Sequence, residues 1–438
     1  HAGRPEWSCP VVFVSIRRST SGLHSNPSRS PPIPRRFMSA SAIATVVLKK
    51  RRALPFFSHH PWVFAGAIER IDGDPQPGDE VRVTAAGGEF IGRGLFNPES
   101  QIRVRIYGWD EARPLDAGFW AERIDQALAL RERLFAGTPR RRACRLIFSE
   151  GDQLSGLTVD RYDDWLLVQW TSRALAARQE EILNHLRERL QPRGIWLRTE
   201  KGIGEAEGLP LADGLLEGEA PPRPLFLEEH GVKLGVDVVE GHKTGYYFDQ
   251  RDNRVAVAAY TQGRRVLDAF CYTGGFGLAA AKHGGAAHVT FVDSSATAID
   301  TARANAELNE IGDRCSFVRS DVVPYLEAAV AGGEQFEVIV LDPPKMARTR
   351  SGLERAAKGY VRLNRLALAA LEPGGILVTC SCSGLVDREG FLDILSRAAL
   401  DAGRTLQVLE VRGQASDHPV SVHCRESAYL KCVIARAV

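Results

Sequence analysis

The sequence predicts an α/β protein with a parallel sheet in the C-terminal part of the chain. Residues 336–341 and 376–380 are short runs rich in Val, Ile and Leu, as expected of strands buried on both faces. The segment between them, about residues 353–371, has apolar positions at helical spacing and predicts a crossover helix that ends at residues 372–375. Strand-like runs followed by glycine-rich turns and helices support a doubly wound arrangement.

Composition places the chain among ordinary globular proteins of two or three domains. It has 438 residues, 44% hydrophobic and 25% charged, and a net charge of only +2, which excludes a strongly basic nucleic-acid coat protein. Its eight cysteines form no CxxC pair, so we expect neither a disulfide framework nor a metal site. Free thiols predict a reducing compartment, the cytoplasm. No apolar run approaches the roughly 18–20 residues that cross a membrane.

The N-terminal part divides into an extension and a small β domain. Residues 1–37 lack a periodic pattern and are interpreted as either a transit peptide or an incorrectly assigned start, and we expect residues 1–43 to form a disordered extension. Residues 44–110 show four strand-like runs separated by turn residues: 46–50, 80–84, 89–94 and 102–107.

Within this β domain, residues 49–62 combine four cations with histidine, phenylalanine and tryptophan. Such a mixture suits an RNA-binding surface, because cations meet phosphates and aromatic rings stack on bases. A solvated basic turn beside an aromatic core cluster is the alternative, and the residues alone slightly favour it.

Residues 111–235 form a second unit of mixed helices and strands. A helix is expected at 115–135, a hairpin at 157–170, a second helix at 174–190 and a strand at 194–198. Residues 202–224 are rich in Gly, Pro and Glu and predict a linker or an exposed insertion. Residues 241–251 are dense in glycine and hydrogen-bonding groups and are expected to close over a ligand.

A cofactor signature opens the C-terminal domain. A strand at 265–270 is followed by a glycine-rich turn, Cys271–Gly277, and a helix. Asp293 lies 19 residues after Gly274, at the end of the next strand, where a ribose-binding carboxylate is expected. Asp321 follows another strand and could meet an adenine amino group.

Two cofactors fit this glycine-rich turn. Its spacing formally matches a dinucleotide fingerprint, so a nicotinamide cofactor has to be considered. Asp268, however, ends the first strand and would place negative charge near a pyrophosphate. S-adenosylmethionine has no phosphate, and its sulfonium and amino groups attract carboxylates. We therefore favour S-adenosylmethionine.

A carboxylate and a thiol follow the two buried strands. Asp342 ends the first and precedes Pro343 and Pro344, whereas Cys380 and Cys382 lie at the end of the second. Cys380 follows apolar residues and is expected in the core. Cys382, flanked by serines, is the better nucleophile.

A thiolate suits methylation of a pyrimidine at carbon 5, because its attack on carbon 6 makes carbon 5 nucleophilic. Asp342 could hold the ring nitrogen and the amino edge of the base. Methylation of a base amino group needs no thiol, and a cysteine that only fills space remains the alternative for Cys382.

At this point several motifs in fixed order resemble those of the ribosomal large subunit methyltransferase I family, bacterial 23S rRNA 5-methylcytosine methyltransferases. The resemblance spans about residue 44 to the C-terminus. It rests on the stretches HHPWVFAGAI (59–68), SQIRVRIY (100–107), EEHGVKLGVDVVEGHKTGYYFDQRDNR (228–254), VLDAFCYTGGF (266–276), VIVLDPPK (338–345), CSCSGL (380–385) and DHPV (417–420).

The resemblance implies a PUA-like RNA-binding domain at 44–110, a central α+β domain at 111–235 and a class I (Rossmann-like) methyltransferase domain at 236–438 that uses S-adenosylmethionine. It implies Cys382 as nucleophile and large-subunit ribosomal RNA as partner. We expect no membrane association and leave a homodimer open. Asp342 is predicted to take part in catalysis together with Cys382. The residues predicted to bind the cofactor are Gln250, Asp268, Tyr272, Thr273, Gly274, Gly275, Asp293, Asp321 and Asp342.

One residue departs from the pattern of many other RNA 5-methylcytosine enzymes. Lys345 follows Asp-Pro-Pro where those enzymes carry a second cysteine, which is thought to help release the product. The base that removes the carbon 5 proton therefore stays unassigned. Two other hypotheses remain: methylation of a guanine or adenine amino group, and an RNA-binding assembly factor without turnover.

Overall fold

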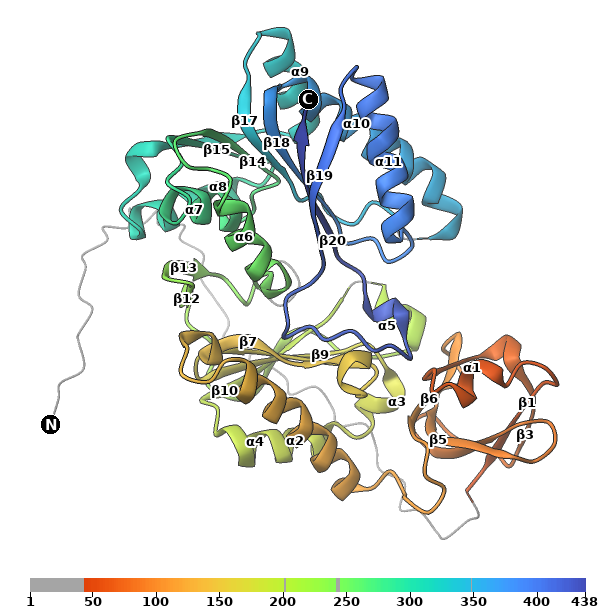
Figure 1. Cartoon of the computed structure of the whole chain (residues 1–438). Coiled ribbons are helices and arrows are strands. Elements are labelled where there is room, and N and C mark those ends of the chain that lie inside the picture. The colour runs from red at the N-terminus through yellow and green to blue at the C-terminus, as the bar shows by residue number, and fades with distance from the viewer. Residues whose placement is uncertain (1–42, 201, 242–244, 348) are drawn as a thin grey trace, which may run out of the picture. The chain divides into compact units, whose positions relative to one another are not determined.

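The structure is a computed structural model of the 438-residue chain, and it describes residues 43–200, 202–241, 245–347 and 349–438 (Figure 1). The expected extension lies outside these residues except for Ile43, and so do residues 242–244 of the loop expected to close over a ligand. Strands of the described part form sheets of six, five, two and seven strands.

The N-terminal β domain is a six-stranded sheet in the order β2-β6-β5-β4-β1-β3. Its strands enclose a core that includes Val46, Val81 and Ile106. The four expected strands are present, the one at 80–84 with both of its ends as predicted and the other three with shifted ends. β2 and β3 were missed because few of their side chains are buried. The elements are β1 (Thr45–Leu48), α1 (Leu54–Phe57), β2 (Trp62–Phe64), β3 (Ile68–Asp72), β4 (Glu80–Thr84), β5 (Phe90–Phe96) and β6 (Ile102–Gly108).

The central domain packs helices against a five-stranded sheet in the order β11-β10-β9-β8-β7. The expected helix at 174–190 is two helices, α3 and α4, which are separated at residues 177–178. The segment 202–224 was expected to be a linker or an exposed insertion; it contains α5 and an edge strand, β11, most of whose residues are exposed. The elements are α2 (Ala117–Leu134), β7 (Ala143–Phe148), β8 (Leu157–Tyr162), β9 (Trp165–Trp170), α3 (Arg173–Ala176), α4 (Gln179–Leu190), β10 (Gly194–Arg198), α5 (Ile203–Glu207) and β11 (Gly214–Gly218).

Burial explains why α5 forms in a glycine-rich segment. The Glu207 carboxylate at the end of α5 is buried and accepts hydrogen bonds from Ser100 Oγ at 2.5 Å and Asn97 Nδ2 at 3.2 Å. Arg105 of β6 lies 3.3 Å from the same carboxylate. These tertiary contacts satisfy a charge that local sequence patterns treat as a solvent-exposed one.

The C-terminal domain contains a seven-stranded sheet in the order β16-β15-β14-β17-β18-β20-β19. The strands from β14 to β18 are parallel, and β20 runs antiparallel to both of its neighbours. The elements are α6 (Arg251–Ala258), β14 (Arg265–Ala269), α7 (Gly275–Lys282), β15 (His288–Asp293), α8 (Ala296–Leu308), β16 (Cys315–Arg319), α9 (Val322–Ala331), β17 (Phe336–Leu341), α10 (Leu353–Ala369), β18 (Leu371–Ser381), α11 (Arg388–Asp401), β19 (Leu406–Arg412) and β20 (Lys431–Ala437).

Helices cover both faces of this sheet, as Figure 1 shows. One core contains Val266 of β14 with residues of α6, α7 and α8, and the other contains Leu267 with residues of α9, α10 and α11. This alternation along one strand explains its continuous apolar sequence. Residues 372–375 were expected to end the preceding helix, but they belong to β18, which begins at Leu371.

A short hairpin, β12 (Leu225–Glu229) and β13 (Val232–Val236), precedes the seven-stranded sheet and packs against α8. Asn305 and Asn309 of α8 hold it through backbone bonds: Asn305 Oδ1 accepts from Gly235 N at 2.7 Å, and Asn309 Oδ1 accepts from Lys233 N at 2.9 Å. The hairpin therefore belongs structurally with this sheet.

The order of the strands creates a switch point between β14 and β17. From β14 the chain first builds one half of the sheet, through β15 and β16, and then crosses back to place β17 on the other side. Connections leave in opposite directions there, so the crevice of an open α/β sheet is expected beyond the carboxyl ends of the two strands. This crevice is where an open α/β sheet binds its ligand.

Candidate active site

Two carboxylates and a thiol, side chains that could take part in catalysis, lie at the carboxyl ends of three neighbouring strands. Asp268 lies near the end of β14, Asp342 directly follows β17, and Cys382 directly follows β18. β17 lies between the other two, in parallel register with both at Leu341. Because neighbouring strands are about 4.8 Å apart, the two carboxylates and the thiol share one edge of the sheet.

The turn between β14 and α7 is forced into conformations that side chains disfavour. Phe270 and Tyr272 have φ values of 62° and 50°, in the left-handed region. A Cβ on Gly275 would lie 2.6 Å from Arg254 Nε, so only glycine fits there. Such strain is concentrated at sites where the surrounding structure and a ligand require it. The arrangement brings the backbone close to the crevice, as a cofactor-binding turn does.

Asp268 anchors this turn, and the pKa of its carboxyl group is unusually high. Its Oδ2 accepts a hydrogen bond from Gly277 N at 2.7 Å, and its side chain is buried. Burial is the main reason that its pKa rises to about 7, and the nearby Asp342 and Asp293 raise it further, whereas Gly277 N–H and Arg254 lower it. The crevice is therefore an acidic environment.

This acidic environment discriminates between the two cofactors considered above. A cation placed among three carboxylates would stabilise their ionised forms, and S-adenosylmethionine brings a sulfonium and an amino group. The pyrophosphate of a nicotinamide dinucleotide would instead be repelled. The residues present thus fit S-adenosylmethionine.

Three of the other expected cofactor residues form or hold the turn itself. Asp293 accepts from Tyr272 N at 3.0 Å and from Ser295 N at 2.9 Å. The hydroxyl of Tyr272 donates to Gly245 O at 3.0 Å and so connects the turn to the loop before α6. Gly274, with a φ of 90°, caps the start of α7.

The remaining residues that we expected at the cofactor site differ in burial. Thr273 is buried, and its carbonyl accepts from Asn305 Nδ2 at 3.1 Å. Gln250 is buried beside the Cys380 thiol, in reach of the sheet edge. Asp321 is exposed where α9 begins, and its side chain makes no capping bond there.

Cys382 lies in a rim of polar side chains. It is half-buried, and its charge influences the titration of Tyr247, Tyr429 and Lys431. The thiol therefore neither points into the apolar interior nor stands fully in solvent. Asp342 also acts on Tyr247, which lies near both groups.

Cys380, two residues earlier, is in a different environment. It is fully buried in the core and pairs across the sheet with Cys432. Its pKa is raised well above the ordinary value, first by a hydrogen bond with the Cys432 thiol and then by burial. A thiol held protonated inside the core is not a nucleophile.

Lys431 is a residue of this site that we did not predict. Only 5% of it is exposed, and Nζ donates to Ser383 O at 2.6 Å and to Tyr429 O at 2.9 Å. Burial lowers its pKa to about 8, the charges of Cys382 and Asp387 oppose that shift, and Lys345 adds to it. No local sequence motif marks Lys431, because only the antiparallel pairing of β20 with β18 brings it opposite Ser381.

The turn after β18 is held by a small hydroxyl cluster. Tyr360 of α10 donates to Ser381 Oγ at 3.0 Å and lies 3.2 Å from Ser383 Oγ. Ser383 Oγ also accepts from Ala347 N at 3.2 Å. These contacts fix the backbone on both sides of Cys382, so the position of its thiol is defined.

Comparison with known proteins identifies the family. Residues 46–109 match the model of a PUA-like domain, and residues 214–420 match that of an S-adenosylmethionine-dependent methyltransferase. A ribosomal RNA large subunit methyltransferase I from Aeromonas salmonicida is 43% identical over 90% of this chain and 99% of its own. One from Shewanella denitrificans is 44% identical over 89% and 98%.

The chain belongs to the ribosomal RNA large subunit methyltransferase I family. The fold is shared with solved structures: a protein from Streptococcus mutans described as an S-adenosylmethionine-dependent methyltransferase superposes with a TM-score of 0.77, at 20% identity, over 90% of this chain and 100% of that one. A methyltransferase structure complexed with SAH gives 0.78 at 21% identity, with the same coverage.

Membership of the ribosomal RNA large subunit methyltransferase I family confirms the expected PUA-like domain, the Rossmann-like methyltransferase fold and the cofactor S-adenosylmethionine. The nicotinamide alternative is thereby excluded. Among the described residues, none of the helices has the length and apolar character needed to span a membrane.

Proposed function

We propose that this protein methylates carbon 5 of a cytosine in large-subunit ribosomal RNA through a transient bond between the base and Cys382. The name of its relatives supports the RNA class. The observation that carries the proposal is the half-buried thiol of Cys382, which lies beside the buried Lys431 and follows the strand next to that of Asp342, at the carboxyl edge of the seven-stranded sheet. Methylation of an amino group would need no such thiol.

The chemistry begins with addition of the Cys382 thiolate to carbon 6 of the cytosine. A sulfur–carbon bond forms, and the electron pair of the carbon 5–carbon 6 double bond becomes available at carbon 5. Bound S-adenosylmethionine supplies the methyl group that carbon 5 takes up. Loss of the carbon 5 proton to a base restores the double bond, breaks the bond to sulfur and returns the thiolate.

Lys431 accounts for how a thiol becomes a thiolate here. Its lowered pKa, about 8, means that the neutral amine is accessible near neutral pH. The neutral amine can accept the proton of Cys382, leaving an ammonium–thiolate pair in which each charge stabilises the other. Two backbone carbonyls hold the ammonium in place, so the pair forms without reorganisation.

Asp342 is suited to hold the base. It follows the strand next to that of Cys382, so its carboxyl group can face the edge of a pyrimidine whose carbon 6 meets the thiol. A carboxyl group there can share a proton with ring nitrogen 3 and bind the amino group. Sharing that proton draws electron density from carbon 6 and favours attack by the thiolate.

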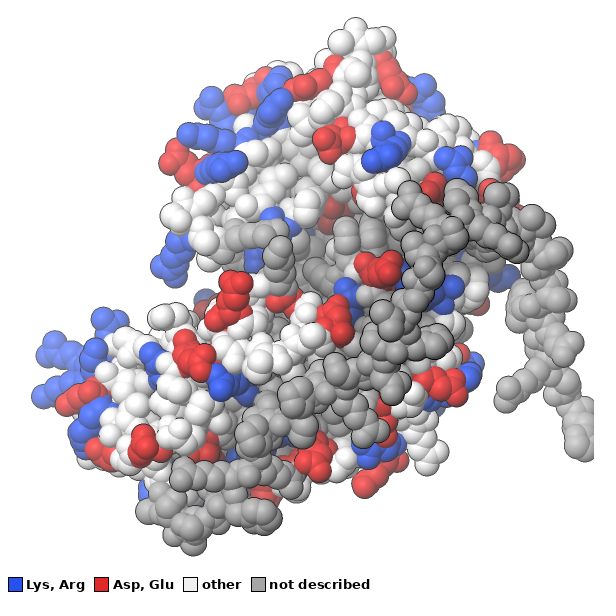
Figure 2. Space-filling model, turned by 180° about the vertical axis from the view of Figure 1, so that it is seen from behind, with Lys and Arg blue, Asp and Glu red and all other residues white. Residues whose placement is uncertain are grey.

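The N-terminal β domain supplies a surface for RNA. Figure 2 shows Lys and Arg side chains gathered at the outer end of this domain. Lys50, Arg51 and Arg52 are exposed and form no ion pair with any described residue. Unpaired cations on an exposed turn bind phosphates, which supports the RNA interpretation of residues 49–62 over the solvated-turn alternative.

The test uses unmodified large-subunit ribosomal RNA, labelled S-adenosylmethionine and nucleoside analysis of the product. We expect 5-methylcytidine with the natural protein, loss of activity by at least about 10³-fold with Cys382→Ala, and near-normal activity with the control Cys380→Ala. Full activity of Cys382→Ala would remove the covalent mechanism. A methylated guanosine or adenosine would support the amino-group alternative, and absence of cofactor binding would support the assembly factor.

A further inference from the structure

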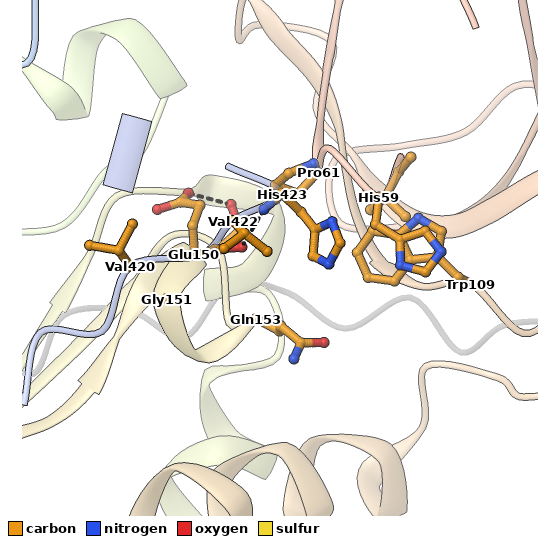
Figure 3. A pocket seen from close by; sticks show the side chains of 12 residues that line it. His59, Pro61, Trp109, Glu150, Gly151, Gln153, Val420, Val422 and His423 are labelled. Carbon is orange, nitrogen blue, oxygen red and sulfur yellow. Dashed lines mark hydrogen bonds between the residues drawn. The ribbon is translucent and has the colours of Figure 1, made fainter. Parts of the chain in front are cut away.

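A cavity lies where the N-terminal β domain, the central domain and the β19–β20 connection meet (Figure 3). It is separate from the sheet edge that holds Asp342 and Cys382. Its volume is about 380 Å³, within the range of small-ligand sites. None of the residues assigned above to the cofactor or to the chemistry lines it. The side chains that matter here are His59 and Trp109 of the β domain, Glu150 and Gln153 of the central domain, and Val422 and His423 of the connection.

Flat rings form one wall of this cavity. The ring of His59 stacks on Trp109, with centroids 4.6 Å apart and planes at 24°, and His423 lies 5.4 Å from His59. Figure 3 shows these rings grouped on one side. Partial burial and the neighbouring His423 lower the pKa of His59, which favours the uncharged form of its ring. An uncharged flat ring is a surface on which a nucleobase stacks.

Two side chains that line the cavity have hydrogen-bonding groups without a partner among the described residues. The Gln153 side chain is exposed and has no hydrogen-bond partner among the described residues. The Nε1 atom of Trp109 is enclosed and also lacks a partner there. Gln153 and His59 both have left-handed backbones, with φ values of 59° and 62°. Strained residues that line a cavity are typical of ligand sites.

The single acidic group of the cavity is already neutralised. Glu150 Oε1 accepts from Trp62 Nε1 at 2.9 Å and from Ser155 Oγ at 2.6 Å, and Arg105 Nη1 lies 3.3 Å away. The cavity therefore does not repel a polyanion as an unpaired carboxylate would. The exposed basic turn at 50–52 lies only seven residues before His59 and can meet phosphates.

We propose that this cavity binds one unstacked base of a single-stranded segment of the RNA substrate. The inference rests on the proposed RNA substrate and adds where the RNA is held. His423 precedes Tyr429 by six residues, and the Tyr429 carbonyl holds Lys431. Six residues span at most about 20 Å, so a single strand several nucleotides long can place one base in the cavity and the target cytosine beside Cys382.

The test compares RNA affinity among variants of the whole protein. Removing a stacking partner of a base costs roughly 5- to 100-fold in affinity, so Trp109→Ala should bind a short single-stranded RNA that much more weakly. His423→Ala, at an exposed residue, should show a smaller loss. Phe64→Ala is the matched control, because Phe64 is a 48% exposed aromatic residue of the same domain that does not line the cavity.

S-adenosylmethionine affinity, measured by calorimetry, serves as the check on folding and should be unchanged in all three variants. A duplex of the same RNA sequence should bind all proteins equally, because its bases are stacked inside the helix. Ultraviolet cross-linking should attach the single strand to the peptide carrying Trp109. Equal single-strand affinity of Trp109→Ala, His423→Ala and the natural protein would overturn the proposal. If affinities change as expected but no methylation is found, the cavity assignment stands and the proposed activity fails.

Discussion

Replacing Lys431 by methionine should raise the pKa of the Cys382 thiol. The substitution keeps the length of the side chain, which is buried, and removes the ammonium group held by Ser383 O and Tyr429 O. An opposite charge in direct neighbourhood lowers a thiol pKa by about 1–3. Because Cys382 is half-buried and solvent screens part of the interaction, we expect a rise of roughly 1–1.5.

The consequence for reactivity follows from the thiolate fraction. Each rise of one in the thiol pKa lowers the thiolate fraction about tenfold at a pH below both values. Alkylation of Cys382 near pH 7 should therefore slow about 10- to 30-fold in Lys431→Met. The ammonium also loses its proton above its own pKa of about 8, so the difference between the two proteins should shrink as the pH rises beyond that value.

The assay is a short iodoacetamide pulse over a pH series, with peptide mass analysis to locate the modified cysteine. Cys315 is the internal reference, because it is also partly exposed and burial raises its pKa to about 11. Its labelling should not respond to Lys431→Met. Neither RNA nor cofactor is needed, so the result does not depend on the identity of the substrate.

Two further variants separate charge from packing. Lys431→Arg keeps the positive charge and should retain most of the Cys382 reactivity, whereas Lys345→Met removes an exposed charge and should change it little. An unchanged pH midpoint for Cys382 in a folded Lys431→Met protein would refute the ammonium–thiolate pair.

Three other perturbations probe the rest of the molecule. Since the Asp268 carboxyl has a pKa of about 7, cofactor affinity should fall as the pH drops below 7, and calorimetry should find that dependence flattened in Asp268→Asn. Gly275→Ala should weaken the cofactor at least about tenfold in the same experiment, because the new Cβ would meet Arg254. Asp417→Ala should lower the free energy of unfolding by about 3–5 kcal/mol in denaturant titrations, since it leaves buried Arg251 without that partner.

The shared sheet edge of Asp268, Asp342 and Cys382 was predictable because its signals are local. A buried strand, an acid at its end and a turn residue after it occupy a few consecutive positions, as at Asp268 and Asp342. Parallel strands then bring their carboxyl ends to one edge without further information. The separation of Cys380 from Cys382 was also predictable, because the apolar run ends between them.

Lys431 could not be found in that way. It lies 48 residues after Ser383, and only the antiparallel return of β20 places it beside the turn. A lysine that begins a strand looks like an ordinary solvent-exposed charge. The same limit applied to α5 and β11, whose glycine-rich sequence becomes ordered through contacts of Glu207 with the N-terminal domain.

The connection between β19 and β20 links recognition to chemistry. Its outer part, with Val422 and His423, lines the cavity, and its last residues place Lys431 beside the thiol. Between these ends the connection is tied to its surroundings, because the hydroxyl of Tyr429 donates to the carboxylate of Asp249. A base bound in the cavity would therefore contact a segment whose movement is restricted and that ends at Lys431. On this reasoning, a short single-stranded RNA that fills the cavity without covering Cys382 should speed alkylation of the thiol, because it fixes the lysine that stabilises the thiolate. His423→Ala should lose that effect while keeping the thiol pKa of the RNA-free protein.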